Sequence, residues 1–387
     1  MSHVGVVDYP TGIFNRTFSM AKELSKLGHD VTITATQNKK LIFPYKKEYR
    51  HGIKIVSFPS FLPMKIRKLG YAILPIVLKF LFVQNKKFDI CHCDNHRPTS
   101  FIPLWLYSKI QKTKIVVEWM DLFGKGGLYD DKSKIWKSTL GFLDNYLEKK
   151  AIKSADGVVV LSDFLKKRAI DLGVNSNCIE KIWGGSDIDT INFTHDSQKN
   201  RRKYSIPENS FVCSVGNMTE HEMELYEADL KRILNLTDNI LIIRTGPFSI
   251  KYHQIFKNRL IQFGYKTYNE YCELLSVSDF FLLLQKNNIR QISRWPNIIG
   301  DFIAAGRPTV ITPAGESAIC LNMHPEAFIL FNSHDKSDVF LKKIKNKCTF
   351  SNKTRIRKIA EKNFNWKYRS IQLSQFYKKT IKTKKLQ

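Results

Sequence analysis

Residues 294–310 have the sequence RWPNIIGDFIAAGRPTV, which predicts a turn, a short helix and a buried strand. Pro296 fixes the backbone at the start of the turn, and Asn297 belongs to the residue types that cap helices. Gly306 and Pro308 end the helix, because neither residue continues one. The apolar residues after Pro308 then form a strand, so this segment by itself indicates an α/β fold.

The start of this predicted helix has the chemistry of an anion site. Its first amide groups have no partner within the helix, and the helix dipole adds positive charge, so a diphosphate suits it. Arg294 can add a charge-assisted contact to the diphosphate. Asp301, about one turn into the helix, can accept hydrogen bonds from ribose hydroxyls. The alternative is a capped structural helix with Arg294 on the surface.

Strand and helix patterns alternate on both sides of this segment, which predicts an α/β architecture with parallel sheets. In the first half, a helix is expected at 15–27 and strands at 4–7, 30–35, 53–58, 88–92, 114–118 and 157–161. In the second half, strands are expected at 211–215, 239–244, 279–284, 309–312 and 327–331. The polar stretch 187–204 indicates a linker, and a last helix is expected at about 366–382.

The charge of this 387-residue chain is +27 and is unevenly placed. Residues 342–387 hold sixteen Lys and Arg and a single acid, Glu361, and residues 62–87 hold six and no acid. Such a field favours a polyanion, namely a nucleic acid, an anionic membrane face or a phosphorylated substrate. No nucleic-acid partner is expected, because no RNP, zinc-finger or helix-turn-helix signature is present. Part of the charge is also explained by a solvated surface.

Seven scattered cysteines are too few for a disulfide framework and indicate a reducing compartment. No stretch is apolar over the roughly 18 residues that a membrane span needs, and no secretion signal begins the chain, so a cytoplasmic protein is expected. Cys91, His92, Cys93 and His96 could form a metal cluster. No second ligand pair follows at zinc spacing, so we interpret them as the end of a buried strand and expect no metal.

Several segments resemble, in order along the chain, the retaining glycosyltransferases of family 4, which have the GT-B fold. GIFNR at 12–16 and AKELSKLGHDV at 21–31 look like the family's glycine loop and first helix. Residues 155–173 resemble the last strand and helix of its N-terminal domain, and WGGSD at 183–187 takes the place of its hinge motif. The resemblance is strongest at 294–310, where one subgroup has a similar pattern.

The resemblance implies two Rossmann-like domains whose parallel sheets face each other across a cleft. The N-terminal domain, 1–188, would bind the acceptor and receive a returning C-terminal helix at about 366–387; the second domain, 204–365, would bind a nucleotide sugar. The implied reaction transfers a sugar, with retention, to a saccharide or lipid-linked saccharide in cell-surface polysaccharide or lipopolysaccharide synthesis. No cofactor is implied besides the nucleotide-sugar substrate. The alternative is a catalytically silent GT-B scaffold at the membrane.

Asp121 is the candidate catalytic residue. It follows the strand expected at 114–118, and carboxylates after such strands lie at the carboxyl edge of the sheet, where ligands bind. The family often has His-Asp here, whereas this chain has Met120-Asp121, so no histidine role can be transferred. Lys125, in the sequence FGKGG, is a candidate for the phosphate or acceptor loop, although FGKGG lacks the spacing of a P-loop.

Four more residues complete the candidate set. Arg244 and Gly246 follow the second strand of the second domain and join Arg294, Pro296, Asn297 and Asp301 as donor-binding candidates. By resemblance, Asp301 matches the second acid of the family's Glu-x7-Glu motif. Gly12 allows a ligand to approach the backbone closely, and Arg16 is a further candidate for the phosphate or acceptor loop.

Three departures from the family pattern favour the silent alternative. Ser293 stands where the family has the first Glu of its motif, and Ile298 stands where the subgroup has a lysine. The family's Arg and Lys pair after the first strand of the second domain is also not evident, because residues 216–224 are acidic. Arg290, Arg294 and Arg244 are the cations that could compensate.

Residues 71–83 are apolar nearly all round and lie between basic residues. The segment is too short to span a membrane, so it is either a buried core helix or an interfacial helix. Related enzymes with lipid-linked acceptors dock through a basic and apolar patch, and the resemblance therefore favours peripheral attachment to the cytoplasmic face of a membrane.

Overall fold

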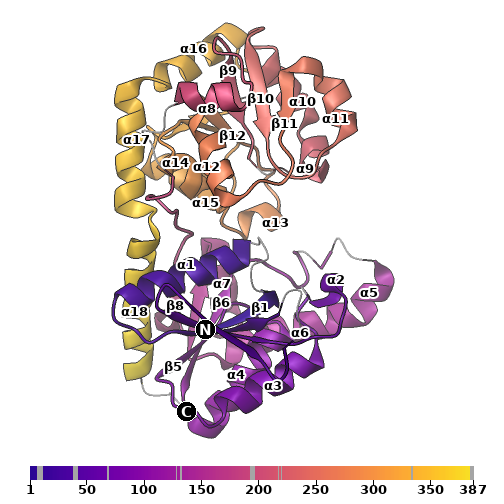
Figure 1. Cartoon of the computed structure of the whole chain (residues 1–387), viewed down its shortest axis with the longest axis vertical. Coiled ribbons are helices and arrows are strands. Elements are labelled where there is room, and N and C mark those ends of the chain that lie inside the picture. The colour runs from indigo at the N-terminus through magenta and orange to yellow at the C-terminus, as the bar shows by residue number, and fades with distance from the viewer. Residues whose placement is uncertain are drawn as a thin grey trace. The chain divides into compact units, whose positions relative to one another are not determined.

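The chain forms two compact units in this computed structural model (Figure 1). The structure describes residues 1–6, 12–37, 42–67, 69–127, 129–130, 133–191, 197–216, 218, 220–332 and 334–383. Unit 1 comprises Met1–Gly184, Asn288–Trp295 and Trp366–Gln387, and unit 2 comprises Gly185–Asn287 and Pro296–Asn365. The domain expected at 204–365 thus includes residues 288–295, which in the structure pack with unit 1.

Unit 1 contains an eight-stranded sheet in the order β3-β4-β2-β1-β5-β6-β7-β8. Its strands are β1 Ser2–Val6, β2 Thr32–Thr36, β3 Lys46–Arg50, β4 Ile53–Phe58, β5 Ile90–Cys93, β6 Lys114–Trp119, β7 Gly157–Val160 and β8 Ile179–Lys181. The edge strand β3 pairs with β4 in antiparallel fashion, and the other pairs are parallel. The strand order reverses between β1 and β5, which is the topological switch point of this doubly wound sheet.

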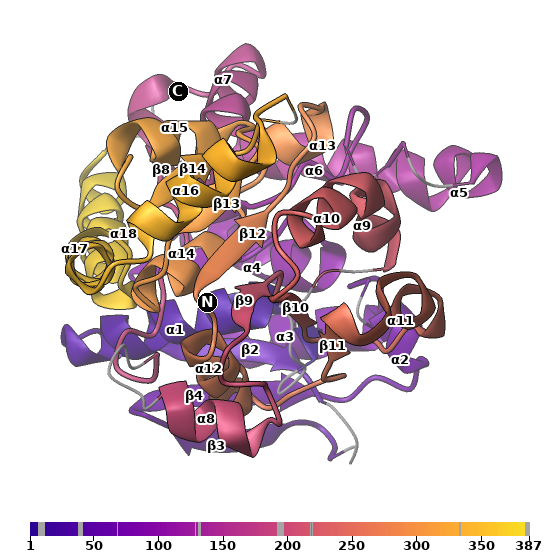
Figure 2. The same cartoon turned by 90° about the horizontal axis from the view of Figure 1, so that it is seen from above.

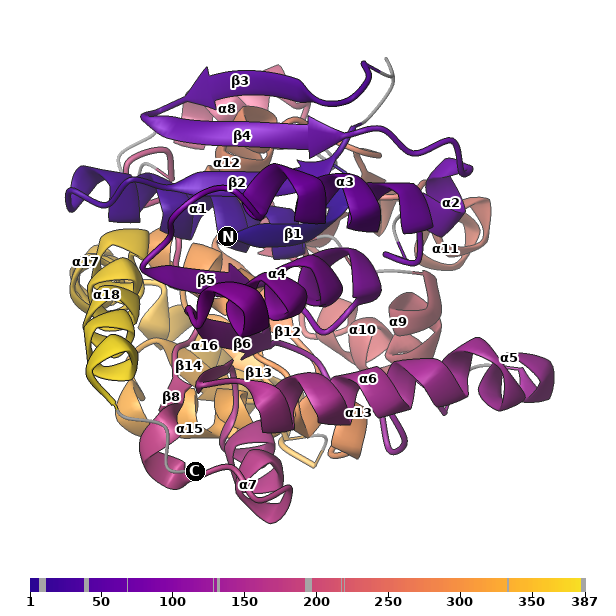
Figure 3. The ribbon, with the colours of Figure 1, turned by 90° about the horizontal axis from the view of Figure 1, so that it is seen from below.

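Helices cover both faces of the unit 1 sheet. One face packs against α1, Gly12–Lys26, and α18, Trp366–Lys382, which also pack on each other. The other face carries α3, α4 and α6, seen from below in Figure 3. The remaining bounds are α2 Met64–Arg67, α3 Ile73–Val83, α4 Pro98–Gln111, α5 Lys134–Ser138, α6 Leu140–Ser154, α7 Asp163–Asp171 and α13 Ile289–Ile292. The predicted return of the last helix to the N-terminal unit is confirmed.

Unit 2 contains a six-stranded parallel sheet in the order β11-β10-β9-β12-β13-β14. Its strands are β9 Phe211–Ser214, β10 Ile240–Arg244, β11 Leu260–Gln262, β12 Phe280–Leu283, β13 Thr309–Ile311 and β14 Phe328–Leu330. The order reverses between β9 and β12, so both units have Rossmann-like topology and the predicted α/β architecture is confirmed. The strands follow one another across the unit in this order in Figure 2.

The helices of unit 2 also lie on both sides of its sheet, with α9, α10 and α11 on one side and α8, α12 and α14 on the other (Figure 2). Their bounds are α8 Ser197–Lys203, α9 Glu220–Leu225, α10 Glu227–Leu234, α11 Ile250–Phe256, α12 Tyr268–Ser276, α14 Ile298–Ala304, α15 Glu316–Met323, α16 Ser337–Lys347 and α17 Phe350–Asn363. One apolar core joins the buried faces of the strands to α10, α11 and α16.

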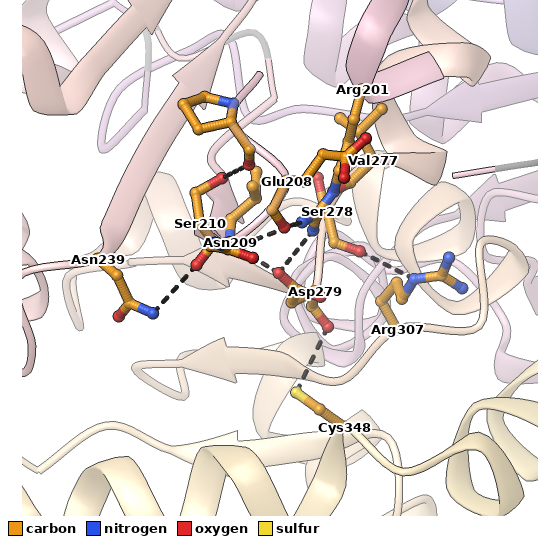
Figure 4. Close-up of polar contacts among 12 residues, drawn as sticks. Arg201, Glu208, Asn209, Ser210, Asn239, Val277, Ser278, Asp279, Arg307 and Cys348 are labelled. Carbon is orange, nitrogen blue, oxygen red and sulfur yellow. Dashed lines mark hydrogen bonds and ion pairs between the residues drawn. The ribbon is translucent and has the colours of Figure 1, made fainter. Parts of the chain in front are cut away.

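The stretch 187–204, expected to be a linker, ends in helix α8 and anchors unit 2. Arg201 of α8 is buried and binds the Asp279 carboxylate at 2.8 Å and the carbonyls of Glu208, Ser210 and Val277 (Figure 4). Asp279 in turn accepts the backbone N–H of Val212 at 2.8 Å. Because every N–H of Arg201 is engaged by the protein, this cluster fixes the amino ends of β9 and β12 and is structural.

Candidate functional site

Helix α14 differs at its start from the sequence-based expectation. Asn297 has helical backbone angles, φ −54° and ψ −29°, and its side chain makes no capping hydrogen bond, so the predicted cap is wrong. The backbone at Asn297 has already entered the helix, whereas a capping residue keeps an extended conformation. Pro296 is half-buried and is the first residue of the second stretch of unit 2.

Gly216 lies directly against the start of α14. It follows β9 with φ +59°, and a Cβ atom added there would lie 2.2 Å from Cδ1 of Ile298. A glycine is therefore required both by the backbone angle and by the close approach. The carboxyl end of β9 and the start of α14 thus meet at the switch point of the unit 2 sheet, which is where doubly wound sheets bind ligands.

Asp301, the candidate ribose ligand, is held by groups of unit 2. Its two carboxylate oxygens accept hydrogen bonds from the Ser186 hydroxyl at 2.9 Å and the Tyr271 hydroxyl at 3.3 Å. Burial raises the pKa of Asp301 to about 7, Asp187 adds to the rise, and the two hydroxyl donors oppose it. The carboxylate therefore exchanges protein donors for ribose hydroxyls if it binds a nucleotide.

Arg244 is a core residue and not a cation at a loop. It ends β10, is 1% exposed, and donates to the carbonyl of Met218 and to Oε1 of Gln262. Burial lowers the pKa of its guanidinium. Gly246 has φ +107°, and its N–H donates to the carbonyl of Gly264 at 2.7 Å. The structure thus gives Arg244 a structural position and corrects its expected role as a donor-binding group.

Asp121 and Arg294 lie together in unit 1. Asp121 follows β6 at the carboxyl edge of the sheet, as expected, and Arg294 and Arg290 come from the segment Asn288–Trp295. Burial raises the pKa of the Asp121 carboxyl, whereas the charges of Arg294 and Arg290 act to lower it and that of Glu148 to raise it further. A carboxylate beside two guanidinium groups is an arrangement that suits a phosphorylated ligand.

The segment Asn288–Trp295 is fixed to unit 1 at several points. The Ser162 hydroxyl, directly after β7, donates to the carbonyl of Ser293 at 2.7 Å. The rings of Trp183 and Trp295 stack with centroids 4.7 Å apart. Arg294 donates through Nε and Nη2 to Oε1 of Gln291, at 3.2 and 2.8 Å. The expected donor set is thereby divided, because Arg294 belongs to unit 1 and Pro296, Asn297 and Asp301 belong to unit 2.

Arg16 is buried in unit 1 and is no phosphate cation. Its guanidinium pairs with Glu118 at 2.6 Å and donates to the carbonyls of Ile182 and Trp183, each at 2.9 Å. The sequence suggested a ligand contact for Arg16 because this residue lies in the first helix, after a glycine loop. The helix buries that position against β6, so the expectation is corrected.

The other two loop candidates have simpler positions. Gly12 begins α1, while most of the loop before it lies outside the described residues. Lys125 is exposed after β6; its backbone N–H donates to Asn145 and its carbonyl accepts from Arg168. Glu148 of α6 accepts the N–H groups of Phe123 and Gly124, both at 2.8 Å, and so shapes this loop.

Comparison with known proteins places the chain. Residues 10–190 match the model of Glycosyltransferase Family 4. The similarity of solved structures over the whole chain shows that the chain has the GT-B fold. No curated protein sequence matches the chain significantly.

Solved GT-B structures resemble the chain over nearly its whole length. HepE from Anabaena, in complex with UDP-glucose, has a TM-score of 0.66 at 15% identity, covering 95% of this chain and 96% of that one. Starch synthase IV from Arabidopsis thaliana, bound to ADP and acarbose, has a TM-score of 0.71 at 13% identity, covering 99% of each chain. WaaG, a glycosyltransferase involved in lipopolysaccharide biosynthesis, has a TM-score of 0.60 at 12% identity, covering 97% of each.

The departures of this chain from the family pattern have structural explanations. Ser293 is buried, and its carbonyl accepts a hydrogen bond from the Ser162 hydroxyl. The residue at this position therefore contacts the protein itself. Ile298 fills the space above Gly216, where a lysine would bring a charge. Sequence analysis missed Ser186 and Tyr271 as site residues: Ser186 was quoted only within the hinge segment 183–187, and Tyr271 lies in no motif. Arg290 was named only as a substitute cation.

Metal-binding clusters and membrane-spanning helices are the two remaining features that the sequence analysis considered. Within the described ranges, no three His, Cys, Asp or Glu side chains are grouped as a metal ion would require. Cys91, His92 and Cys93 are buried in and around β5, and His92 shares a hydrogen bond of 2.6 Å with Tyr377. Of the helices in the described part of the chain, none combines the length and hydrophobicity that crossing a membrane takes.

Proposed function

We propose that the protein transfers a sugar from a nucleoside diphosphate sugar to a saccharide or lipid-linked saccharide acceptor. The observation that carries the proposal is the Asp121 carboxyl group at the carboxyl edge of the unit 1 sheet, within electrostatic range of Arg290 and Arg294 of the same unit. The nucleotide-bound structures of HepE and starch synthase IV support a nucleotide-sugar donor. The role of WaaG supports a place in cell-surface polysaccharide or lipopolysaccharide synthesis. Retention rests on the resemblance to retaining enzymes.

The residues divide the chemical work as follows. The guanidinium groups of Arg294 and Arg290 neutralise the leaving diphosphate, which is the largest electrostatic need of the reaction. In unit 2, Asp301 binds the ribose hydroxyls, and Gly216, Pro296 and Asn297 present backbone groups at the switch point of the sheet. Asp121 is the catalytic residue, in contact with the reacting sugars. No metal or other cofactor is required, because fixed cations serve the diphosphate.

Replacing Arg294 with alanine is expected to weaken binding of the donor nucleotide at least about tenfold, which corresponds to one charge-assisted contact. Isothermal titration with UDP, GDP and ADP measures this, first on the unaltered protein and then on Arg294→Ala. Arg202→Ala is the matched control, since Arg202 is an exposed arginine whose partner, Glu208, lies at 3.0 Å. Absence of binding to all three nucleotides, or equal affinity in Arg294→Ala, would contradict the proposal; binding without turnover would favour the silent scaffold.

We further propose that unit 1 attaches to the cytoplasmic face of an anionic membrane. Helix α3 buries Pro75, Lys79 and Val83, and exposes Ile73, Val77 and Leu81 on its other side. An exposed apolar stripe of this spacing is typical of an interfacial helix. Lys79 adds no surface charge, because its amine is buried and donates to the carbonyl of Thr99 at 2.8 Å. The exposed Lys87 and Lys109 supply positive charge at the ends of α3 and of its neighbour α4.

Sedimentation with lipid vesicles tests this attachment. The protein is expected to bind phosphatidylcholine vesicles that contain phosphatidylglycerol, and Ile73→Glu/Leu81→Glu is expected to reduce that binding about tenfold or more, because charges replace inserted apolar side chains. Ile250→Glu is the control, since Ile250 is 66% exposed but lies in unit 2. Equal binding of the double variant and the control would rule out α3 as the attachment surface.

A further inference from the structure

We propose that Glu148 is a positioning residue that holds Asp121 in its catalytic place at the edge of the unit 1 sheet; this inference rests on the proposed sugar transfer. Glu148 belongs to α6, and its side chain is buried. Its carboxylate accepts hydrogen bonds from the indole Nε1 of Trp119 at 2.9 Å and from the N–H groups of Phe123 and Gly124, each at 2.8 Å. All three donors lie in the segment that contains Asp121.

These hydrogen bonds fix the chain on both sides of Asp121. Trp119 ends β6 two residues before Asp121, and Phe123 follows two residues after it. Both donate to the same oxygen, Oε1 of the Glu148 carboxylate, so one atom of α6 joins the two ends of the stretch 119–123. The side chains next to Asp121, those of Met120 and Leu122, are buried. With its neighbours packed and both ends bonded, Asp121 has a fixed position at the edge of the sheet.

The glycines of the sequence FGKGG at 123–127 are explained by this contact. A Cβ atom at Gly124 would lie 2.5 Å from Oε2 of Glu148, so a glycine lets the backbone N–H reach the carboxylate. A Cβ atom at Gly127 would overlap the carbonyl oxygen of Leu122, and the N–H of Gly127 donates to the carbonyl of Gly124 at 3.0 Å. These two glycines therefore allow the loop after β6 to fold closely against Glu148.

The charge of Glu148 acts on Asp121 in addition to its hydrogen bonds. The charged groups that act on Asp121 are the guanidinium groups of Arg294 and Arg290, from the segment Asn288–Trp295, and the carboxylate of Glu148, from α6. Burial is the largest cause of the raised pKa of Asp121; the two arginines act to lower this pKa, and Glu148 acts to raise it further. A like charge disfavours the ionised form, so without Glu148 the Asp121 carboxyl would ionise at lower pH.

Variants of Glu148 separate its hydrogen bonds from its charge. The kcat is measured for transfer or hydrolysis of whichever of UDP-glucose, GDP-mannose and ADP-glucose the protein uses. Glu148→Ala removes all three hydrogen bonds and is expected to lower kcat about 100-fold, the effect of a misplacement of roughly 1 Å at a reacting group. Nucleotide affinity is expected to stay unchanged, because the arginines that bind the diphosphate are kept.

The pH profile of kcat gives a readout that a merely structural role would not move. Glu148→Gln keeps the length of the side chain and an acceptor for Trp119 and Phe123 but removes the charge, so the acid limb is expected to move to lower pH. Glu148→Asp keeps the charge on a shorter side chain and is expected to lower kcat less than Glu148→Ala, with the acid limb in place. Asp144→Asn is the matched control, because Asp144 is a buried acid of the same helix; it is expected to lower stability and leave the acid limb in place.

Gly124→Ala tests the same contact from the side of the loop. The added methyl group displaces the Glu148 carboxylate and is expected to lower kcat, while Gly124→Ala/Glu148→Ala is expected to be no slower than Glu148→Ala, because both changes remove one contact. If the Glu148 variants keep the kcat and the acid limb of the unaltered protein while Asp121→Asn loses activity, the inference alone is overturned. No nucleotide binding by the unaltered protein would overturn the proposed function, and binding without transfer or hydrolysis would count against both.

Discussion

Replacing Arg16 with methionine is expected to destabilise unit 1 by about 3–5 kcal/mol, the usual cost of leaving one member of a buried ion pair without its partner. Arg16 and Glu118 are 1% and 2% exposed at their side chains and lie 2.6 Å apart. Arg16 also donates to two backbone carbonyls that follow β8, so the change removes hydrogen bonds that join α1, β6 and the end of the sheet. Methionine fills much of the volume, so the expected loss comes from the charge and the hydrogen bonds and little from packing.

Tryptophan fluorescence during urea unfolding measures this loss in unit 1 alone. All six tryptophans of the chain lie in the residues of unit 1, so the signal does not mix the two units. Lys26→Met in unit 1 is the control, because Lys26 is 55% exposed in its pair with Glu23, and exposed pairs contribute about 0–1 kcal/mol. The double variant Arg16→Met/Glu118→Met removes both charges and is expected to recover part of the stability. A single variant no weaker than the control would refute the argument.

The same ion pair predicts how stability depends on pH. Burial acts to raise the pKa of Glu118, but Arg16, with help from His92, outweighs it and lowers the pKa from 4.5 to about 2. A carboxyl whose pKa is lowered by folding contributes stability above its unfolded value, and this contribution is lost as the pH falls from about 4.5 to about 2. Arg16→Met is therefore expected to flatten this part of the pH dependence.

Much of the fold follows from sequence patterns, because the central strands are short apolar runs between turn residues. The strands predicted around 53–58, 114–118 and 309–312 agree with β4, β6 and β13. The edge strands β3, β8 and β11 were missed, since β3 is charged and largely exposed and the other two have only three residues each. Edge strands are recognised mainly by their pairing with neighbours, which periodicity in a single segment does not contain.

The site residues are harder to predict from the sequence than the fold, because burial decides whether a charged side chain contacts a ligand or other groups of the protein. Arg16 and Arg244 have the residue type of phosphate ligands, yet both are 1% exposed and bonded within their units. Asp121 and Arg294 are 173 positions apart in the sequence numbering and meet because residues 288–295 pack on unit 1. The stacking of Trp295 on Trp183 and the Ser162 contact reveal that packing.

Replacing Asp121 with asparagine is expected to lower kcat about 100- to 1,000-fold, the range found when one preorganised electrostatic group is removed from an active site. Asparagine has nearly the same shape but no charge, so nucleotide affinity should change little. Because burial raises the pKa of Asp121, activity that needs the carboxylate falls as the pH drops through that raised pKa. The residual activity of Asp121→Asn is expected to lack this fall.

The pH profile also tests the link between Asp121 and the segment that carries the arginines. Arg294 acts to lower the pKa of Asp121, so Arg294→Lys should leave the acid limb of the kcat profile in place, whereas Arg294→Ala should move it to higher pH. Asp130→Asn is a control for Asp121→Asn, since Asp130 is an exposed carboxylate of the same loop. An unchanged kcat in Asp121→Asn would show that Asp121 is not the catalytic residue. If the acid limb of the kcat profile stays at the same pH in Arg294→Ala, Arg294 does not act on the pKa of Asp121, whatever Arg294 contributes to donor binding.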